Sequence, residues 1–118
     1  MFAGFLLAGI GSPTEMDYMK TPAAHAVAAP RFRLGQIVAT AGALRLLDKH
    51  QSTPSEYLLR HVSGDWGSVP PEDAMANEEA LKGGLRVLSS YSIGEADKLW
   101  IITEADRSVT TLLLPADY

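Results

Sequence analysis

The sequence predicts an α+β domain in which one short strand and three helices precede a three-stranded antiparallel meander. Two features of the chain support this class. Between residues 41 and 84, apolar residues recur at helical spacing, whereas from Arg86 onward they form β-branched and aromatic runs of seven or eight residues. Short polar connections at 94–97 and 105–107 separate these runs, which is typical of strands that turn back on their neighbours.

The length of 118 residues fits one domain, and 47% apolar with 20% charged residues is ordinary for a globular protein. We expect residues 31–118 to form this domain and residues 1–30, which end in an Ala/Pro-rich stretch, to be a poorly ordered extension. No Lys or Arg precedes the first apolar run, so a signal peptide is disfavoured and a cytoplasmic location is expected. No apolar run is long enough to span a membrane, and no membrane partner is predicted.

The first half of the domain carries two marked helix starts. A β-branched run over 35–40 predicts the first strand, and Thr40 then caps a helix over 41–50. Thr53, with proline next and Glu56 three residues on, predicts a capping box for a second helix over 54–61.

A glycine- and proline-rich loop over 61–71 carries Trp66, whose ring we expect to cover a helix. The third helix, within 70–84, has acids in its first turn and Lys82 in its last. Gly83 is predicted to take the left-handed conformation that stops it.

The second half of the domain is predicted to hold strands at 86–93, 98–104 and 108–115. In the middle one, Leu99, Ile101 and Thr103 share one face, whereas Trp100 and Ile102 share the other. Both faces are fairly apolar, which favours a central strand with helices packed on one side.

Composition and motifs exclude several classes of function. A net charge of −4 disfavours strong binding of duplex DNA, and the absence of cysteine removes disulfides and thiolate metal sites. The histidines have no partner at ligand spacing; Asp65, Glu72 and Asp73 could bind a hard cation, although acids at a helix start are expected anyway. Neither a nucleophile elbow nor a phosphate loop is present, so no metal and no cofactor are predicted.

A polar set remains around the loop 61–67 and the corner 104–108. Its candidate catalytic residues are His61, Arg86, Arg107 and Thr110, and its candidate binding residues are Asp65, Trp66, Glu104, Asp106 and Ser108. An imidazole can move protons near neutral pH, and a guanidinium can stabilise developing negative charge. In the structural alternative His61 caps its helix, Asp65 makes a turn hydrogen bond, and Arg107 pairs with Glu104.

Four stretches from about Leu34 to Tyr118, "LGQIVATAGAL", "LLRHVSGDWG", "NEEALKGGLRVLSSY" and "WIITEADRSVTTLLLP", resemble a family of small uncharacterised bacterial proteins. Plasmids and integrative elements carry this family, whose members are often labelled plasmid-related or as type I restriction subunits. The resemblance implies an accessory protein of a mobile genetic element. The chain lacks the cofactor loop and the N/D-P-P-Y/F motif of an adenine methyltransferase, which disfavours the restriction label.

The order of elements, with His61, Asn77 and Thr110, is also similar to that of the colicin D and barnase-like metal-independent ribonucleases. That similarity implies His61 as general acid/base, with Arg86 or Arg107 stabilising charge. Three functions therefore stay open: binding of a host protein or RNA through the loop and the corner, RNA cleavage, and a structural role as a homodimer formed through an edge strand.

Overall fold

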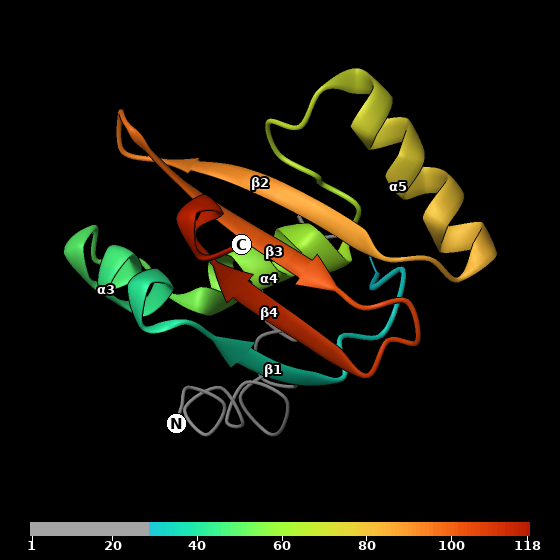
Figure 1. Ribbon diagram of the computed structural model, residues 1–118, viewed down its shortest axis with the longest axis horizontal. Helices are drawn as coiled ribbons and strands as arrows, with labels where there is room; N and C mark the ends of the chain where they lie inside the picture. Colours follow the sequence, from blue (N-terminus) through green and yellow to red (C-terminus); the bar gives the residue numbers. More distant parts are fainter. Residues whose placement is uncertain (1–28) are drawn as a thin grey trace.

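The computed structural model describes residues 29–118, so the expected N-terminal extension lies outside the described residues except for its last two positions. The elements are β1 (Gln36–Ala39), α3 (Ala41–Lys49), α4 (Pro54–Val62), α5 (Pro71–Gly83), β2 (Val87–Ile93), β3 (Asp97–Thr103), β4 (Val109–Leu113) and the 3-10 helix η3 (Pro115–Asp117) (Figure 1). The predicted α+β class is confirmed, and each predicted helix and strand is present. None of the helices within residues 29–118 combines the length and apolar character needed to cross a membrane.

The sheet is mixed, which corrects the expected purely antiparallel arrangement. Strands β2, β3 and β4 form the predicted antiparallel meander, but β1 joins its edge parallel to β4, in the order β1-β4-β3-β2. The Gln36 and Thr40 N–H groups donate to the carbonyls of Ser108 and Leu112 at 2.9 and 3.0 Å. A parallel pair requires a long crossover, here the chain from α3 to β3, and hydrophobic periodicity does not reveal such distant pairing.

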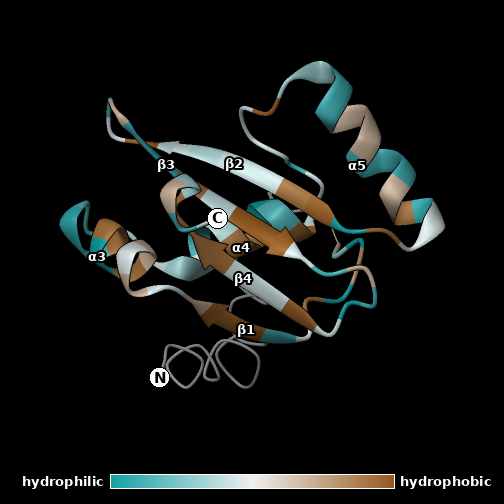
Figure 2. Ribbon diagram, viewed as in Figure 1, coloured by the Kyte–Doolittle hydropathy of each residue, from teal (hydrophilic) through white to brown (hydrophobic). Residues whose placement is uncertain are grey.

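One face of the sheet, called the inner face, packs on α3 and α4 and holds the main core. The register aligns Leu99 and Ile101 of β3 with Tyr91 of β2 and Leu112 of β4 on this face, and Leu58 of α4 packs against them. Figure 1 shows α4 behind the sheet and η3 in front, across the opposite or outer face. In Figure 2 the hydrophobic colour lies largely on the strands, whereas α5 alternates between hydrophobic and hydrophilic residues.

Local capping follows the sequence with one correction. The Thr40 hydroxyl accepts a hydrogen bond from the Ala43 N–H at 3.1 Å, and the Glu56 carboxylate accepts from the Thr53 N–H at 3.0 Å. Helix α5 extends through Gly83, and Gly84, with φ 68°, is the residue that takes the left-handed conformation. The pattern of two successive glycines does not indicate which of them lies beyond the last helical turn.

The edge of the sheet formed by β2 is covered by side-chain and loop contacts. The Asn77 side chain of α5 donates to the Leu88 carbonyl at 2.8 Å and accepts from the Leu88 N–H at 3.1 Å, as a neighbouring strand would. Two residues on, the Ser90 N–H donates to Trp66 O at 3.0 Å and Ser90 O accepts from Ser68 N–H at 2.7 Å. Strand pairing with a second copy, the third predicted function, would therefore have to use β1.

Candidate functional site

His61 lies in the last turn of α4 and is fully buried against the inner face of the sheet. Its Nδ1 lies 2.6 Å from Ser89 Oγ, and its Nε2 lies 2.9 Å from Thr103 Oγ1. The chain of hydrogen bonds continues from Thr103 Oγ1 to Thr110 Oγ1 at 2.7 Å. The Thr110 hydroxyl then donates to the carbonyl of Leu34 at 2.7 Å.

The direction of these hydrogen bonds fixes the tautomer of His61. Each hydroxyl carries one hydrogen, and that of Thr110 goes to a carbonyl, which can only accept. Thr103 must therefore donate to Thr110, and His61 must donate from Nε2 to Thr103. In the neutral imidazole Nδ1 is then the acceptor for the Ser89 hydroxyl, and the proton lies on Nε2.

Burial keeps this imidazole neutral well below neutral pH. Desolvation, reinforced by the positive charge of Arg107, lowers the pKa of His61 from 6.5 to about 3. A general acid or base at neutral pH needs a pKa near 7 and direct reach to a substrate. His61 has neither, since its side chain is inaccessible and both of its ring nitrogens are bonded within the fold.

An aromatic column connects the loop to the corner. The ring of Trp66, which is only 6% exposed, stacks on Phe32 with centroids 6.1 Å apart. The Arg107 guanidinium lies 5.5 Å from the centroid of the same Phe32 ring. His61 approaches both aromatic rings edge-on, at 5.2 and 5.9 Å. Trp66 also packs against Ala80 of α5, as expected for a ring that covers a helix.

The chain segment that carries Phe32 runs from the loop to the corner. At one end the Arg31 N–H donates to Val62 O at 2.8 Å, and at the other the Gln36 N–H donates to Ser108 O at 2.9 Å. A Cβ on Gly35, which has φ +66°, would lie 2.3 Å from that same Ser108 carbonyl oxygen. The loop, this segment and the corner therefore form one continuous surface, and the candidate site predicted from the sequence depends on this arrangement.

Arg107 organises the corner through main-chain carbonyls. It adopts a positive φ of 60°, which is uncommon outside glycine. Its Nη1 donates to Leu85 O at 2.6 Å and to Glu104 O at 3.0 Å, and its Nη2 donates to Ala80 O near the end of α5 at 3.3 Å. The predicted pairing of Arg107 with Glu104 thus occurs through the backbone carbonyl of Glu104.

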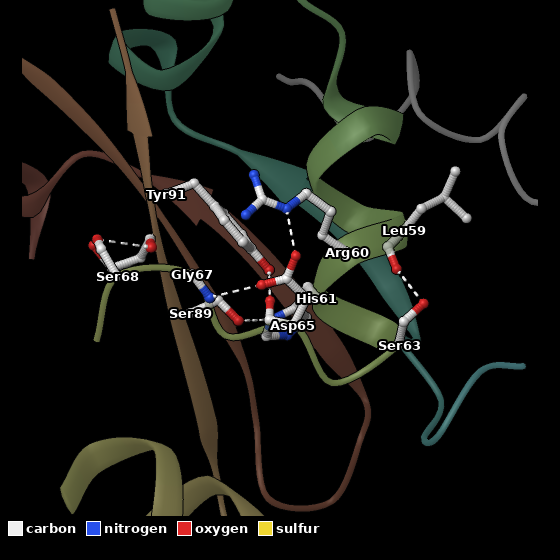
Figure 3. A network of polar contacts seen from close by, with 10 residues as sticks. Leu59, Arg60, His61, Ser63, Asp65, Gly67, Ser68, Ser89 and Tyr91 are labelled. Atoms are coloured by element: carbon white, nitrogen blue, oxygen red, sulfur yellow. Dashed lines mark hydrogen bonds and ion pairs between the residues drawn. The ribbon is translucent and has the colours of Figure 1, made fainter. Parts of the chain in front are cut away.

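Asp65 holds the loop in shape (Figure 3). Its carboxylate accepts from Arg60 Nε at 2.7 Å and from the Gly67 N–H at 3.1 Å, and its carbonyl accepts from the Tyr91 hydroxyl at 2.6 Å. The hydrogen bond from Arg60 is the main reason that the pKa of Asp65 lies below its usual value. The predicted turn hydrogen bond is present, and the exposed carboxylate stays charged.

The structure separates Arg86 from the other candidates. Its Nη2 donates to the Tyr118 hydroxyl at 2.6 Å, and Tyr118 contacts Trp100 on the outer face, whereas His61 lies against the inner face. The structure therefore does not bring Arg86 together with His61, since a residue next to a strand can point to either face. Thr110 does reach His61, through Thr103.

The remaining corner residues are accessible. Asp106 and Ser108 are exposed and Glu104 is half-buried. The Asp106 carboxylate accepts from the Ser108 N–H at 3.0 Å, and hydrogen bonds from Ser108 lower its pKa. Within residues 29–118 no group of three or more His, Asp or Glu side chains is arranged to hold a metal ion.

Four residues that shape the site are not among the predicted site residues: Phe32, Ser89, Tyr91 and Thr103. Ser89 and Tyr91 had a usable signal, because strand alternation places both on the same face as Ile93 and Val87. Phe32 had none, because its segment has no periodic pattern. Searches with the chain match no family model, no curated protein and no solved structure.

Proposed function

We propose that this protein is a non-catalytic binding protein that contacts a partner protein through the loop 61–67 and the corner 104–108. The observation that carries this proposal is the contact of Trp66 and Arg107 with the same ring, Phe32, which joins both segments into one preformed surface. Rigid loops on a stable scaffold are typical of binding sites. From the resemblance to plasmid-borne proteins, we further propose a host protein met by a mobile genetic element.

The charges of this surface favour protein over RNA. Arg60 is paired with Asp65, and Arg31 makes a bidentate pair with Glu78 at 2.8 and 3.0 Å. The guanidinium of Arg107 is bonded to carbonyls. The guanidiniums of Arg31, Arg60 and Arg107 are thus already engaged, whereas Asp106 offers an exposed carboxylate to a basic partner.

The ribonuclease alternative requires His61 to reach RNA. The buried, neutral imidazole argues against this, and Arg86 lies across the sheet. We expect no cleavage of total RNA by the protein in EDTA. Cleavage that is lost in His61→Gln, while circular dichroism shows that the fold is retained, would contradict the proposal and support the ribonuclease alternative.

Charge reversal at the corner tests the proposed surface. Immobilised wild type is expected to retain a specific host protein from lysate, and Asp106→Lys is expected to retain at least about tenfold less, because charge complementarity fails. Asp73→Lys, an exposed acid in the first turn of α5, is the matched control and should behave as wild type. Equal retention by all three proteins, or retention by none, would contradict the proposal.

A further inference from the structure

The outer face of the sheet carries a row of basic and aromatic side chains that lies outside the proposed partner surface. Lys98 and Trp100 lie two residues apart on β3 and share this face. Trp100 contacts Tyr118 edge-on with centroids 5.7 Å apart, and the Arg86 guanidinium lies 5.7 Å from the Tyr118 ring. Two cations therefore flank two aromatic rings.

Acidic groups are sparse along this row. Among the residues that the four described strands place on the outer face there is no Asp or Glu, and Lys98 is the charged one. Lys98 donates to the neutral hydroxyls of Ser68 and Ser92 at 3.3 and 3.4 Å, so its charge has no carboxylate partner in these contacts. The nearest acids along the chain are Asp97, whose side chain points to the other face and lies 3.5 Å from Lys49, and Glu95 in the turn before β3. Asp117 of η3 is bonded to Thr40 at 2.7 Å.

We propose that this row binds a short segment of single-stranded nucleic acid. Bases stack on accessible aromatic rings whatever their sequence, and lysine and arginine contact the phosphates on either side. Trp100 is half-buried, whereas Tyr118 is 67% exposed. From Lys98 to the end of β3, beside which Arg86 directly precedes β2, the row spans roughly 17 Å at about 3.3 Å per residue, which suits a few nucleotides.

The same chemistry disfavours the other occupants of an open sheet face. A second copy docked face to face would bring the two rows of cations together, with no strand carboxylate to compensate. Duplex DNA hides the faces of its bases, and the net charge of −4 opposes binding through phosphates alone. A single strand offers both stacking and phosphate contact.

Fluorescence anisotropy with labelled uridine and thymidine octanucleotides at low salt tests the proposal. Wild type is expected to bind these single strands more tightly than a duplex hairpin, and Trp100→Ala to weaken binding at least about tenfold through loss of stacking. Lys98→Ala should reduce the slope of log K against log salt by about 0.7. Tighter binding of the uridine than of the thymidine strand would identify RNA, and equal binding would identify single strands of either type.

Matched controls separate these effects from damage to the fold. Met75→Ala and Lys82→Ala remove an exposed apolar and an exposed basic side chain from α5 and should bind as wild type. Trp100→Phe keeps a ring and should bind within about threefold of wild type. Asp106→Lys should also bind normally, since this site is independent of the corner.

Three results would overturn the proposal. The first is no binding of either single strand by a folded wild type. The second is unchanged binding in both Trp100→Ala and Lys98→Ala. The third is a stable dimer by light scattering that Trp100→Ala dissociates, which would identify a second copy as the occupant of the face.

Discussion

Replacing His61 by alanine is expected to lower the free energy of unfolding by about 3–5 kcal/mol, the range for removal of a large buried ring. The imidazole is fully buried, and its loss leaves the Ser89 hydroxyl without its acceptor in a site closed to solvent. A buried hydroxyl without a partner adds a penalty of about 1–3 kcal/mol. Urea denaturation followed by circular dichroism measures the change.

A pair of variants separates the lost packing from the lost hydrogen bond. His61→Leu fills much of the space but leaves the Ser89 hydroxyl unpaired, whereas His61→Leu with Ser89→Ala removes both partners. The double variant should be more stable than His61→Leu, because removing both partners is cheaper than stranding one. Equal stability of the two variants would show that the Ser89 hydroxyl finds another partner.

The same histidine makes the wild type sensitive to mild acid. Its pKa is lowered to about 3 in the folded state, so below about 6.5 only the unfolded chain takes up this proton, and stability falls as the pH falls. From pH 7 to pH 5 the expected loss is about 2 kcal/mol, at about 1.4 kcal/mol per pH unit.

His61→Leu should lose this dependence between pH 6.5 and 5, as measured by urea denaturation at each pH. Comparing it with the wild type also cancels the contributions of all groups that the two proteins share. The carboxyls with lowered pKa values, such as Asp65 and Glu78, change the stability only in more acidic solution, where they take up protons. An unchanged slope in His61→Leu would contradict the neutral, buried imidazole.

Gly67→Ala is expected to detach the loop from β2 at a cost of about 3 kcal/mol or more. Gly67 has φ +78°, and a Cβ there would lie 2.0 Å from Ser90 O and 2.8 Å from a ring carbon of Tyr91. The carbonyl cannot retreat freely, because it accepts from the Ser68 N–H at 2.7 Å within the contact that covers β2. Hydrogen exchange at the Ser90 amide, together with urea denaturation, measures the detachment.

Gly83→Ala is the matched control for this substitution. Gly83 is the last residue of α5, and a Cβ there would meet no other atom within 4 Å. Alanine should leave stability unchanged or raise it by up to about 1 kcal/mol, since it restricts the unfolded chain. A similar loss of stability in both variants would mean that the left-handed conformation and close contact of Gly67 are not the cause of the effect.

The element order was predictable because local signals marked most boundaries. Thr40 and Glu56 make the predicted capping contacts, and alternation correctly placed Leu99 and Ile101 on one shared face of their strand. The parallel pairing of β1 with β4 was not predictable, since it depends on residues more than 70 positions apart in sequence, such as Gln36 and Val109.

The candidate site was predictable as a place but not as chemistry. The expected meeting of the loop and the corner does occur, yet its connector, Phe32, lies in a segment without a pattern. The sequence around a histidine near a helix end does not indicate whether the side chain faces solvent or a sheet. Only the register that puts Ser89 and Thr103 beneath His61 distinguishes the two cases.

Three of the carbonyls to which Arg107 donates belong to separate parts of the chain. One is Ala80 in the last turns of α5, one is Leu85 before β2 and one is Glu104 after β3, so the guanidinium is a common anchor for a helix and two strands. Loosening the corner would therefore shorten the lifetime of hydrogen bonds at the C-terminal end of α5. A ligand that rigidifies the corner would slow amide exchange at the end of α5, although it does not contact that helix.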